Sequence, residues 1–385
     1  QNTLKVGAYL RTTDRRADAP IYAFISRASQ DVVRQSPDVI FGAGQACDGC
    51  SNINVQPIGQ AGSYSADDRT AAAYLMADWG LTSRTRMIAG ARVEQAKIDV
   101  AASTQGGFTT NAALDNTDVL PSLLLNTRLT DNQNLRFGIT RTLARPEYRE
   151  LAPVTFRDVL GGVSVTGNAN LVRSLIDNVD LRWEAFPNPG EVFSIGVFAK
   201  RFDRPIERLE QATSGAYQAR FQNALSATNY GVELELRKQL GFLGTWGEAF
   251  TGFSNVTLMS SRVKLDSTGG LTVTDAQRRL VGQAPYVVNT GLTYSNLSGS
   301  TNATLLYNVV GERITAAGVV PLPNIVEKPR HLIDLSLRIP VAGSLSARVD
   351  ARNLLDARTR FMQGNLEREG FNSGRSFSMG LSWRQ

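Results

Sequence analysis

The sequence is poor in the residues from which catalytic and metal sites are most often built. Its 385 residues include a single histidine, His331, and two cysteines, Cys47 and Cys50. A serine–histidine–aspartate arrangement would have to use His331, and no G-x-S-x-G nucleophile motif occurs. We therefore expect no enzymatic activity, no cofactor and no metal site.

Long hydrophobic runs and linkers are also missing. No stretch of about 18 apolar residues occurs, which excludes a membrane-spanning helix, and the mean hydropathy is −0.17. A soluble chain of 385 residues would be expected to divide into domains, yet no Pro/Gly/Ser-rich segment or shift in composition separates any. A closed β-barrel removes this conflict, because it adds strands without thickening a core. Its alternating pattern also escapes hydropathy averages.

A concentrated positive charge is absent as well. The net charge of +6 could indicate a nucleic-acid partner. However, no basic run occurs, and arginines stand beside carboxylates in strand-like segments, as in Arg182/Glu184 and Arg348/Asp350. We expect no nucleic-acid partner.

What the sequence has in abundance is alternation of apolar and polar residues. Leu345–Arg352 alternates without error, and the polar positions of Val179–Ala185 are all charged. Ser376–Trp383 places a large apolar residue at every second position, with serine or glycine between. Helical spacing does not compete in these windows. Because a strand points successive side chains to opposite faces, each segment has one apolar and one polar face.

We predict about fourteen such strands. Their approximate ranges are 4–10, 70–80, 84–98, 119–130, 133–142, 177–186, 191–202, 226–240, 246–265, 284–296, 299–312, 330–339, 343–353 and 373–384. Most are long enough for a tilted strand to cross a bilayer. Aromatic residues lie near their ends, as an interfacial girdle would: Trp79, Trp183, Phe186, Tyr286, Tyr294 and Trp383.

The connections alternate between short and long. Short turns fall at Thr130–Asn132, Pro187–Gly190, Asn296–Ser298 and Pro340–Gly343. Long loops fall at 11–69, 101–118, 143–176, 203–225, 266–283, 313–329 and 354–372. This asymmetry predicts an all-β, transmembrane, antiparallel up-and-down barrel with short periplasmic turns and long external loops. A soluble β-sheet protein also alternates and is the alternative.

The two cysteines lie in the motif C-D-G-C within the longest loop. A redox pair of this spacing would call for a βαβ context, and zinc would need further ligands than Cys47 and Cys50. An external loop meets oxidising surroundings, so we expect a small loop-closing disulfide between them.

Short motifs follow one another in order over residues 119–385. They are Thr142–Pro153 (T-x-x-R-P-x-x-x-E-L-x-P), Gly167–Leu171 (G-N-x-x-L), Asp180–Glu184 (D-L-x-x-E), Asn229–Glu235, Arg352–Asp356 with N-L-x-D, and Gly374–Phe377. As an ordered set they resemble the C-terminal barrel of TonB-dependent outer-membrane receptors. Residues 1–118 fit by strand pattern only.

The resemblance implies a 22-stranded barrel, plugged by an N-terminal domain, that imports siderophores, cobalamin, haem or oligosaccharides with energy from TonB. Residues 1–385 would form its C-terminal part, with the plug and about eight first strands absent. The expected partners are TonB, through that missing N-terminal region, outer-membrane lipid and a small-molecule ligand. The expected location is the outer membrane of a Gram-negative bacterium.

The ligand-binding residues cannot be named from the resemblance. Charged residues on the polar strand face would stabilise the plug or tune selectivity: Arg182, Glu184, Glu233, Glu235, Arg348 and Asp350. The alternative function is a passive, porin-like channel of the same architecture.

Overall fold

Strands dominate the computed structural model of this chain. The structure describes residues 2–383 except 27–28, 43, 45, 51–52, 61, 104–107, 158–162, 213–216, 266–272 and 297. Within these residues, no helix is both long and apolar enough to span a bilayer.

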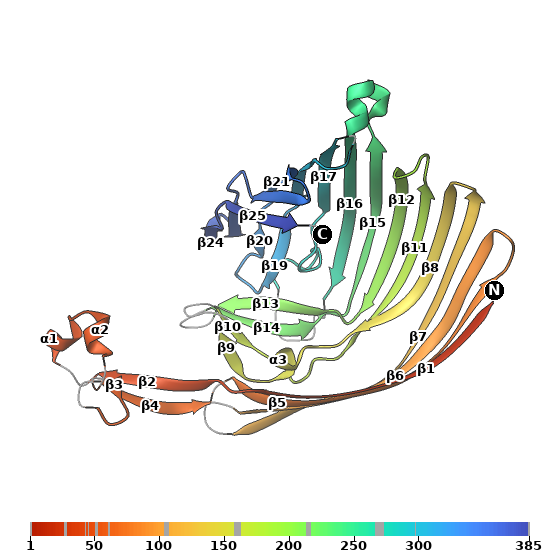
Figure 1. The fold of residues 1–385 in the computed structure, drawn as a ribbon. Helices are drawn as coiled ribbons and strands as arrows, with labels where there is room; N and C mark the ends of the chain where they lie inside the picture. The colour runs from red at the N-terminus through yellow and green to blue at the C-terminus, as the bar shows by residue number, and fades with distance from the viewer. Residues whose placement is uncertain are drawn as a thin grey trace.

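Fourteen strands form one antiparallel up-and-down sheet (Figure 1). They are β1 (Thr3–Ala17), β5 (Ser63–Gly80), β6 (Thr85–Ser103), β7 (Thr109–Thr130), β8 (Gln133–Ala144), β11 (Ser174–Ala185), β12 (Val192–Asp203), β15 (Ser226–Gln239), β16 (Phe250–Lys264), β17 (Tyr286–Ser295), β18 (Asn302–Val310), β21 (Arg330–Ala342), β22 (Leu345–Arg352) and β25 (Ser376–Trp383). These match the predicted strands one for one, so the predicted architecture is confirmed.

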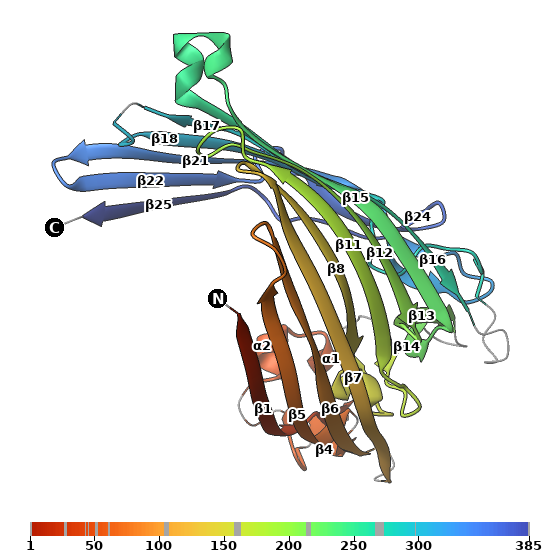
Figure 2. The same cartoon turned by 90° about the vertical axis from the view of Figure 1, so that its right-hand side faces the viewer.

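The sheet is open along two edges. Among the described residues, β1 pairs only with β5 and β25 only with β22. Figures 1 and 2 show the result as a strongly curved trough, bounded by β1 on one side and β25 on the other.

The two faces of the sheet differ in chemistry because the strand register keeps the alternation in phase. On the outer face Leu181 lies opposite Val197, which lies opposite Val232. One residue along, on the inner face, Arg182 lies beside Gly196. Leu181 and Val232 are 41% and 37% exposed, although both belong to central strands. The apolar rows therefore form an outer surface rather than a packed core.

The connections at the two ends of the sheet also differ. At the turn end, β5–β6, β7–β8 and β21–β22 are joined by residues 81–84, 131–132 and 343–344. The other long connections lie at the opposite, loop end, whereas residues 240–249 between β15 and β16 lie at the turn end. The predicted long loop at 101–118 is wrong, because β6 extends to Ser103 and β7 already begins at Thr109.

The ranges of the long connections alone suggested irregular loops, but the connections contain regular structure. They contain β2 (Pro20–Ser26), α1 (Gln30–Val33), α2 (Pro37–Ile40), β3 (Ala46–Cys47), β4 (Ile53–Gln60), α3 (Tyr148–Leu151), β9 (Thr155–Arg157), β10 (Ser164–Thr166), β13 (Ile206–Ala212), β14 (Tyr217–Asn223), β19 (Arg313–Gly318), β20 (Ile325–Glu327), β23 (Arg358–Gln363) and β24 (Leu366–Asn372). Eight of these strands form a second sheet, in the order β24-β23-β20-β19-β13-β14-β10-β9.

The connection between β15 and β16 departs from the predicted strand 246–265. Gly241–Leu243 and Thr245–Ala249 form two short 3-10 helices, which stand beyond the sheet in Figure 2. Gly244 lies between them at φ +106°, a conformation that favours glycine. A Cβ at Gly247 would collide with the Leu240 carbonyl oxygen. These two glycines permit the helical excursion, and β16 begins only after it.

The main buried core lies where the β8–β11 connection folds against the inner face of β5, β6 and β7. Leu151 and Leu171 of this connection are 0% and 1% exposed. They belong to one cluster with Ile98, Val100 and Leu114 of the strands. The loop end is therefore packed from within.

Candidate functional site

A charged network runs along the inner face in the middle of the sheet. Arg182 of β11 donates from Nε to Glu184 at 3.0 Å and from Nη2 to Glu235 of β15. Its Nη1 lies 4.0 Å from Glu233, and Glu184 also lies 2.9 Å from Nε of Arg136. Four of the six charged residues predicted to face the lumen thus lie together. Together with Arg136 they hold two positive and three negative charges, so the network has a net charge of −1.

The other two predicted lumen residues form a separate pair. Nε of Arg348 lies 3.0 Å from Oδ2 of Asp350 on β22, and the Ser336 hydroxyl donates to Asp350 at 2.6 Å. Four strands lie between β15 and β22 in the sheet, so this pair does not join the Arg182 network.

The sequence motif Thr142–Pro153 anchors its loop to the inner wall. Arg145 lies 2.7 Å from Glu94 of β6, and the Tyr148 hydroxyl donates to Asp68 of β5 at 2.8 Å. Leu151 then enters the buried core. The motif therefore fixes a long external loop against the wall below it.

The short helix α3 within this motif has a complete capping box. The Glu147 side chain accepts from the backbone at position 150, and the Glu150 carboxylate accepts from the Glu147 backbone N–H at 2.9 Å. Burial raises the pKa of Glu150, and the neighbouring Glu147 carboxylate adds to the rise, while the backbone hydrogen bond opposes it. The helix thus holds a partly desolvated carboxylate in a fixed position.

Two further ion pairs hold the second sheet together. Arg278 donates from Nη1 and Nη2 to the two oxygens of Glu207, at 2.9 and 2.7 Å, and these side chains are 0% and 2% exposed. Arg368 donates to Glu210 at 2.5 Å and lies over the Tyr217 ring at 4.2 Å. Both pairs join different long connections, so they set how the loops stand relative to one another.

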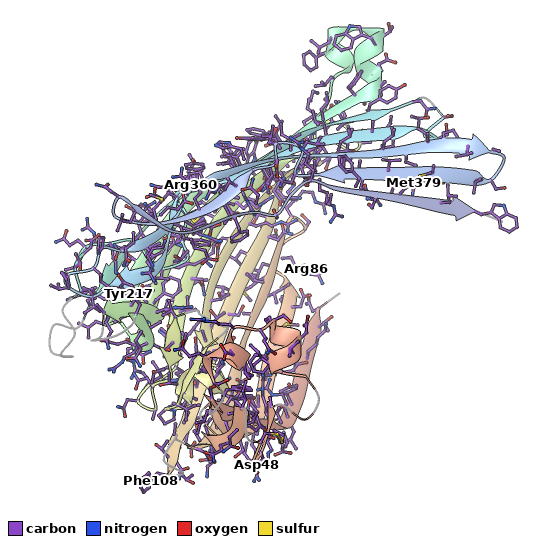
Figure 3. The ribbon with its side chains drawn as sticks, turned by 90° about the vertical axis from the view of Figure 1, so that its left-hand side faces the viewer. Asp48, Arg86, Phe108, Tyr217, Arg360 and Met379 are labelled. Atoms are coloured by element: carbon purple, nitrogen blue, oxygen red, sulfur yellow. A yellow bond between two sulfur atoms is a disulfide. The ribbon has the colours of Figure 1, made fainter. Side chains whose placement is uncertain are left out.

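The C-D-G-C motif lies at the tip of the longest connection. The Sγ atoms of Cys47 and Cys50 are 2.04 Å apart, at disulfide distance. Figure 3 shows Asp48, between them, at the far end of the loop side. Within the described ranges, no group of three His, Cys, Asp or Glu residues could hold a metal. His331 lies elsewhere, with Nδ1 2.6 Å from the Tyr307 hydroxyl.

Residues 27–354 match the family described as "TonB dependent receptor-like, beta-barrel". The chain belongs to this family. Its members are receptors and transporters of the outer membrane of Gram-negative bacteria. A search of curated proteins finds no match for the sequence.

Solved structures of receptors share the fold at low sequence identity. The ferric yersiniabactin uptake receptor FyuA from Yersinia pestis has a TM-score of 0.64 at 15% identity, over 99% of this chain and 51% of that chain. The copper transporter OprC has a TM-score of 0.65 at 16% identity, over 99% of this chain and 54% of that chain. The R480A mutant of the ferric enterobactin receptor PfeA from Pseudomonas aeruginosa has a TM-score of 0.57 at 16% identity. The match covers 98% of this chain and 59% of that chain. The chain thus spans about half the length of the receptors it matches.

Sequence reasoning missed the buried pairs of the loop end. Arg278 and Glu207 are 71 residues apart, and Arg368 and Glu210 are 158 apart. No local pattern marks either pair, because their contact depends on how separate loops meet. The pairs Arg182/Glu184 and Arg348/Asp350 could be seen in advance, since residues two apart in a strand share a face.

Proposed function

We propose that this protein is a TonB-dependent outer-membrane receptor that captures a scarce ligand with its long external loops. The ligand belongs to the siderophore, cobalamin, haem or oligosaccharide classes, and it passes along the polar inner face toward the periplasm with energy from TonB. FyuA is described as a ferric yersiniabactin uptake receptor and OprC as a copper transporter. Ferric siderophores are therefore the first of these classes to test, and copper is a further ligand to test outside them.

The observation that carries this proposal is the inward anchoring of the β8–β11 connection. Arg145 and Tyr148 bind the inner wall through Glu94 and Asp68, and Leu151 packs beneath them. A ligand seated on these loops would lie directly above the charged inner face. Binding outside and passage inside would thus be mechanically connected.

We also propose that residues 1–385 form the C-terminal part of a 22-stranded barrel. The free edges of β1 and β25 support this, because lipid offers no hydrogen-bond partners to an open sheet edge. About eight further strands would close the barrel. A plug N-terminal to them would make the contact with TonB.

The test is uptake of a radiolabelled ferric siderophore, and separately of copper, by Gram-negative cells that produce the protein. Paired strains with and without TonB supply the control. We expect saturable uptake of one ligand that disappears without TonB. Flux that rises linearly with concentration and ignores TonB would instead favour a porin-like channel.

We propose that Cys47 and Cys50 form a structural disulfide in the exported protein. Alkylation followed by mass spectrometry should label neither cysteine until a reductant is added. Labelling without a reductant, together with bound zinc in metal analysis, would favour the metal-site alternative.

A further inference from the structure

A row of basic residues crosses the outer face of the sheet at its loop end. The strand register places Arg141 of β8 opposite Asp177 of β11, and Asp177 opposite Arg201 of β12. Arg201 lies opposite Thr228 of β15, which lies opposite Arg262 of β16. We call these five residues the basic row. They form one continuous line across five neighbouring strands.

The basic row lies on the apolar face rather than in the lumen. Strand alternation gives Arg201 the same face as Ile195 and Val197, and gives Asp177 the same face as Val179. The adjacent row toward the turn end is Ile139, Val179, Ala199, Tyr230 and Ser260. On β8, β11 and β12 the change from apolar to charged therefore occurs at the same register position, whereas β15 contributes the uncharged Thr228 and β16 places Arg262 after Ser260.

The position of the basic row fits the border of a hydrocarbon layer. At the turn end, Trp183 and Phe193 pack edge to face at 5.7 Å, as in an interfacial aromatic girdle. Arg201 lies eight residues beyond Phe193 on β12, about 26 Å along the strand. For a strand tilted by about 35–45°, this length spans a height of about 19–22 Å, so the row lies near the loop-end border of a lipid-facing band about 25 Å tall.

The row carries more positive charge than its own partners neutralise. Arg141 binds Asp177 through two hydrogen bonds, of 2.6 and 3.1 Å. Arg201 and Arg262 are exposed and form no hydrogen bond or ion pair with their side chains anywhere in the described part of the chain. A second carboxylate, Asp203, shares this face two residues beyond Arg201, but it lies 3.3 Å from Nε of Arg204, which is its own counter-charge. The three arginines and Asp177 of the row therefore leave two positive charges. Neighbouring strands are about 4.8 Å apart, so the arginines recur about every 10 Å.

We infer that the basic row binds the phosphate groups of a membrane lipid in the outer leaflet. Guanidinium groups suit phosphate because their planar donors pair with two of its oxygens. The row continues the lipid-facing surface, so a phosphate there would belong to a lipid whose chains cover Val179 and Ala199. This inference rests on the proposed placement in the outer membrane.

The loop end of β5 and β6, nearer the β1 edge of the sheet, supplies a matched control. Arg69 of β5 and Lys97 of β6 are also exposed, face outward and lie opposite each other. Here the number of carboxylates is closer to the number of cations, because Lys97 lies opposite Asp115 and 3.8 Å from Asp99. Removing these two cations changes the net charge as much as removing Arg201 and Arg262, but at a site with its own counter-charges.

The experiment measures binding of lipid A, a phosphorylated glycolipid, to the protein in nanodiscs of phosphatidylcholine. We expect R201Q/R262Q to bind about 30-fold more weakly than the wild type, since each arginine at an anionic lipid surface contributes roughly fivefold. R201K/R262K should keep most of the affinity, and R69Q/K97Q should stay within about twofold of the wild type. Dephosphorylated lipid A should not distinguish the wild type from R201Q/R262Q.

Three results would overturn the inference. They are unchanged affinity in R201Q/R262Q, an equal loss in R69Q/K97Q, or competition by inorganic phosphate at matched concentration, which would indicate a site for soluble anions. Flotation with neutral vesicles separates these results from failure of the proposed function. A protein that does not float refutes the membrane placement and the inference with it, whereas one that floats but ignores lipid A refutes the inference alone.

Discussion

Acidic residues on the inner side of this protein behave differently at the loop end and in the middle of the sheet. At the loop end, the side chains of Asp68 and Asp118 are 3% and 2% exposed, and each is held by an arginine. In the middle of the sheet, Glu184 is 9% exposed, whereas Glu233 and Glu235 remain 50% and 38% exposed around Arg182. The same residue types thus serve as fixed anchors where they are buried and as a hydrated wall where they are not. Burial decides between these roles, because it removes the water that would replace a lost partner.

The largest expected effect comes from breaking a buried pair. Arg278→Met leaves Glu207 charged and buried without its partner, so we expect the free energy of unfolding to fall by about 3–5 kcal/mol. Arg182→Met in the hydrated network should cost about 1 kcal/mol or less. Urea unfolding in lipid vesicles measures both. Equal losses would show that burial is not what separates the two regions.

The apolar core of the loop end should respond next most strongly. Leu151→Ala opens a cavity in a completely buried site, and we expect a loss of about 2–5 kcal/mol in the same assay. Leu236→Ala is the control, because Leu236 faces outward and is 44% exposed. An equal loss in the free energy of unfolding for Leu236→Ala would contradict this expectation.

Two glycines of the inner wall test how tightly the middle of the sheet is packed. A Cβ at Gly231 would lie 2.5 Å from the Leu258 carbonyl oxygen and 2.6 Å from the Phe198 ring, whereas at Gly196 the nearest atom lies 3.7 Å away. Gly231→Ala should therefore cost about 1–3 kcal/mol, and Gly196→Ala close to nothing. Heat-induced unfolding of the paired variants distinguishes them, and similar midpoints would contradict the crowded packing at Gly231.

The smallest effect concerns pH and helix α3. Because burial raises the pKa of Glu150 in the folded protein, its favourable contribution is complete below the unfolded pKa and is lost as pH rises through the folded pKa. Glu150→Gln keeps the capping box and removes the charge. We expect this variant to be slightly more stable than the wild type at pH 7 and equal to it at pH 4 and below. A variant that is less stable at pH 7 would refute the assignment.

The spanning strands could be predicted from the sequence because their signal is local. Alternation in β11, β15 and β22 defines both faces within a few residues. The last part of the excursion, residues 246–249, was predicted as the start of β16, since its apolar residues continue the strand-like composition. The second sheet escaped prediction for another reason. Its strands are short, and their pairing, such as β13 with β19, joins loops far apart in the sequence.

The contacts of the candidate site also divide into those that the sequence predicts and those that it does not. Arg182 and Glu184 could be paired in advance, but Glu207 and Arg278 could not, because only the assembled loop end brings them together. The basic row was also invisible in the sequence. Arg141, Arg201 and Arg262 belong to strands whose relative register sequence patterns do not supply.

The free edge of β25 has a consequence for how the protein behaves outside its membrane. An unpaired strand edge is a template on which another strand can assemble, and whichever strand arrives first sets the register. Two copies could therefore join edge to edge in detergent and propagate into ribbons, with Phe377, Met379, Leu381 and Trp383 already exposed along the seam. Because this association needs two or more copies to meet, a low protein concentration during purification should limit it.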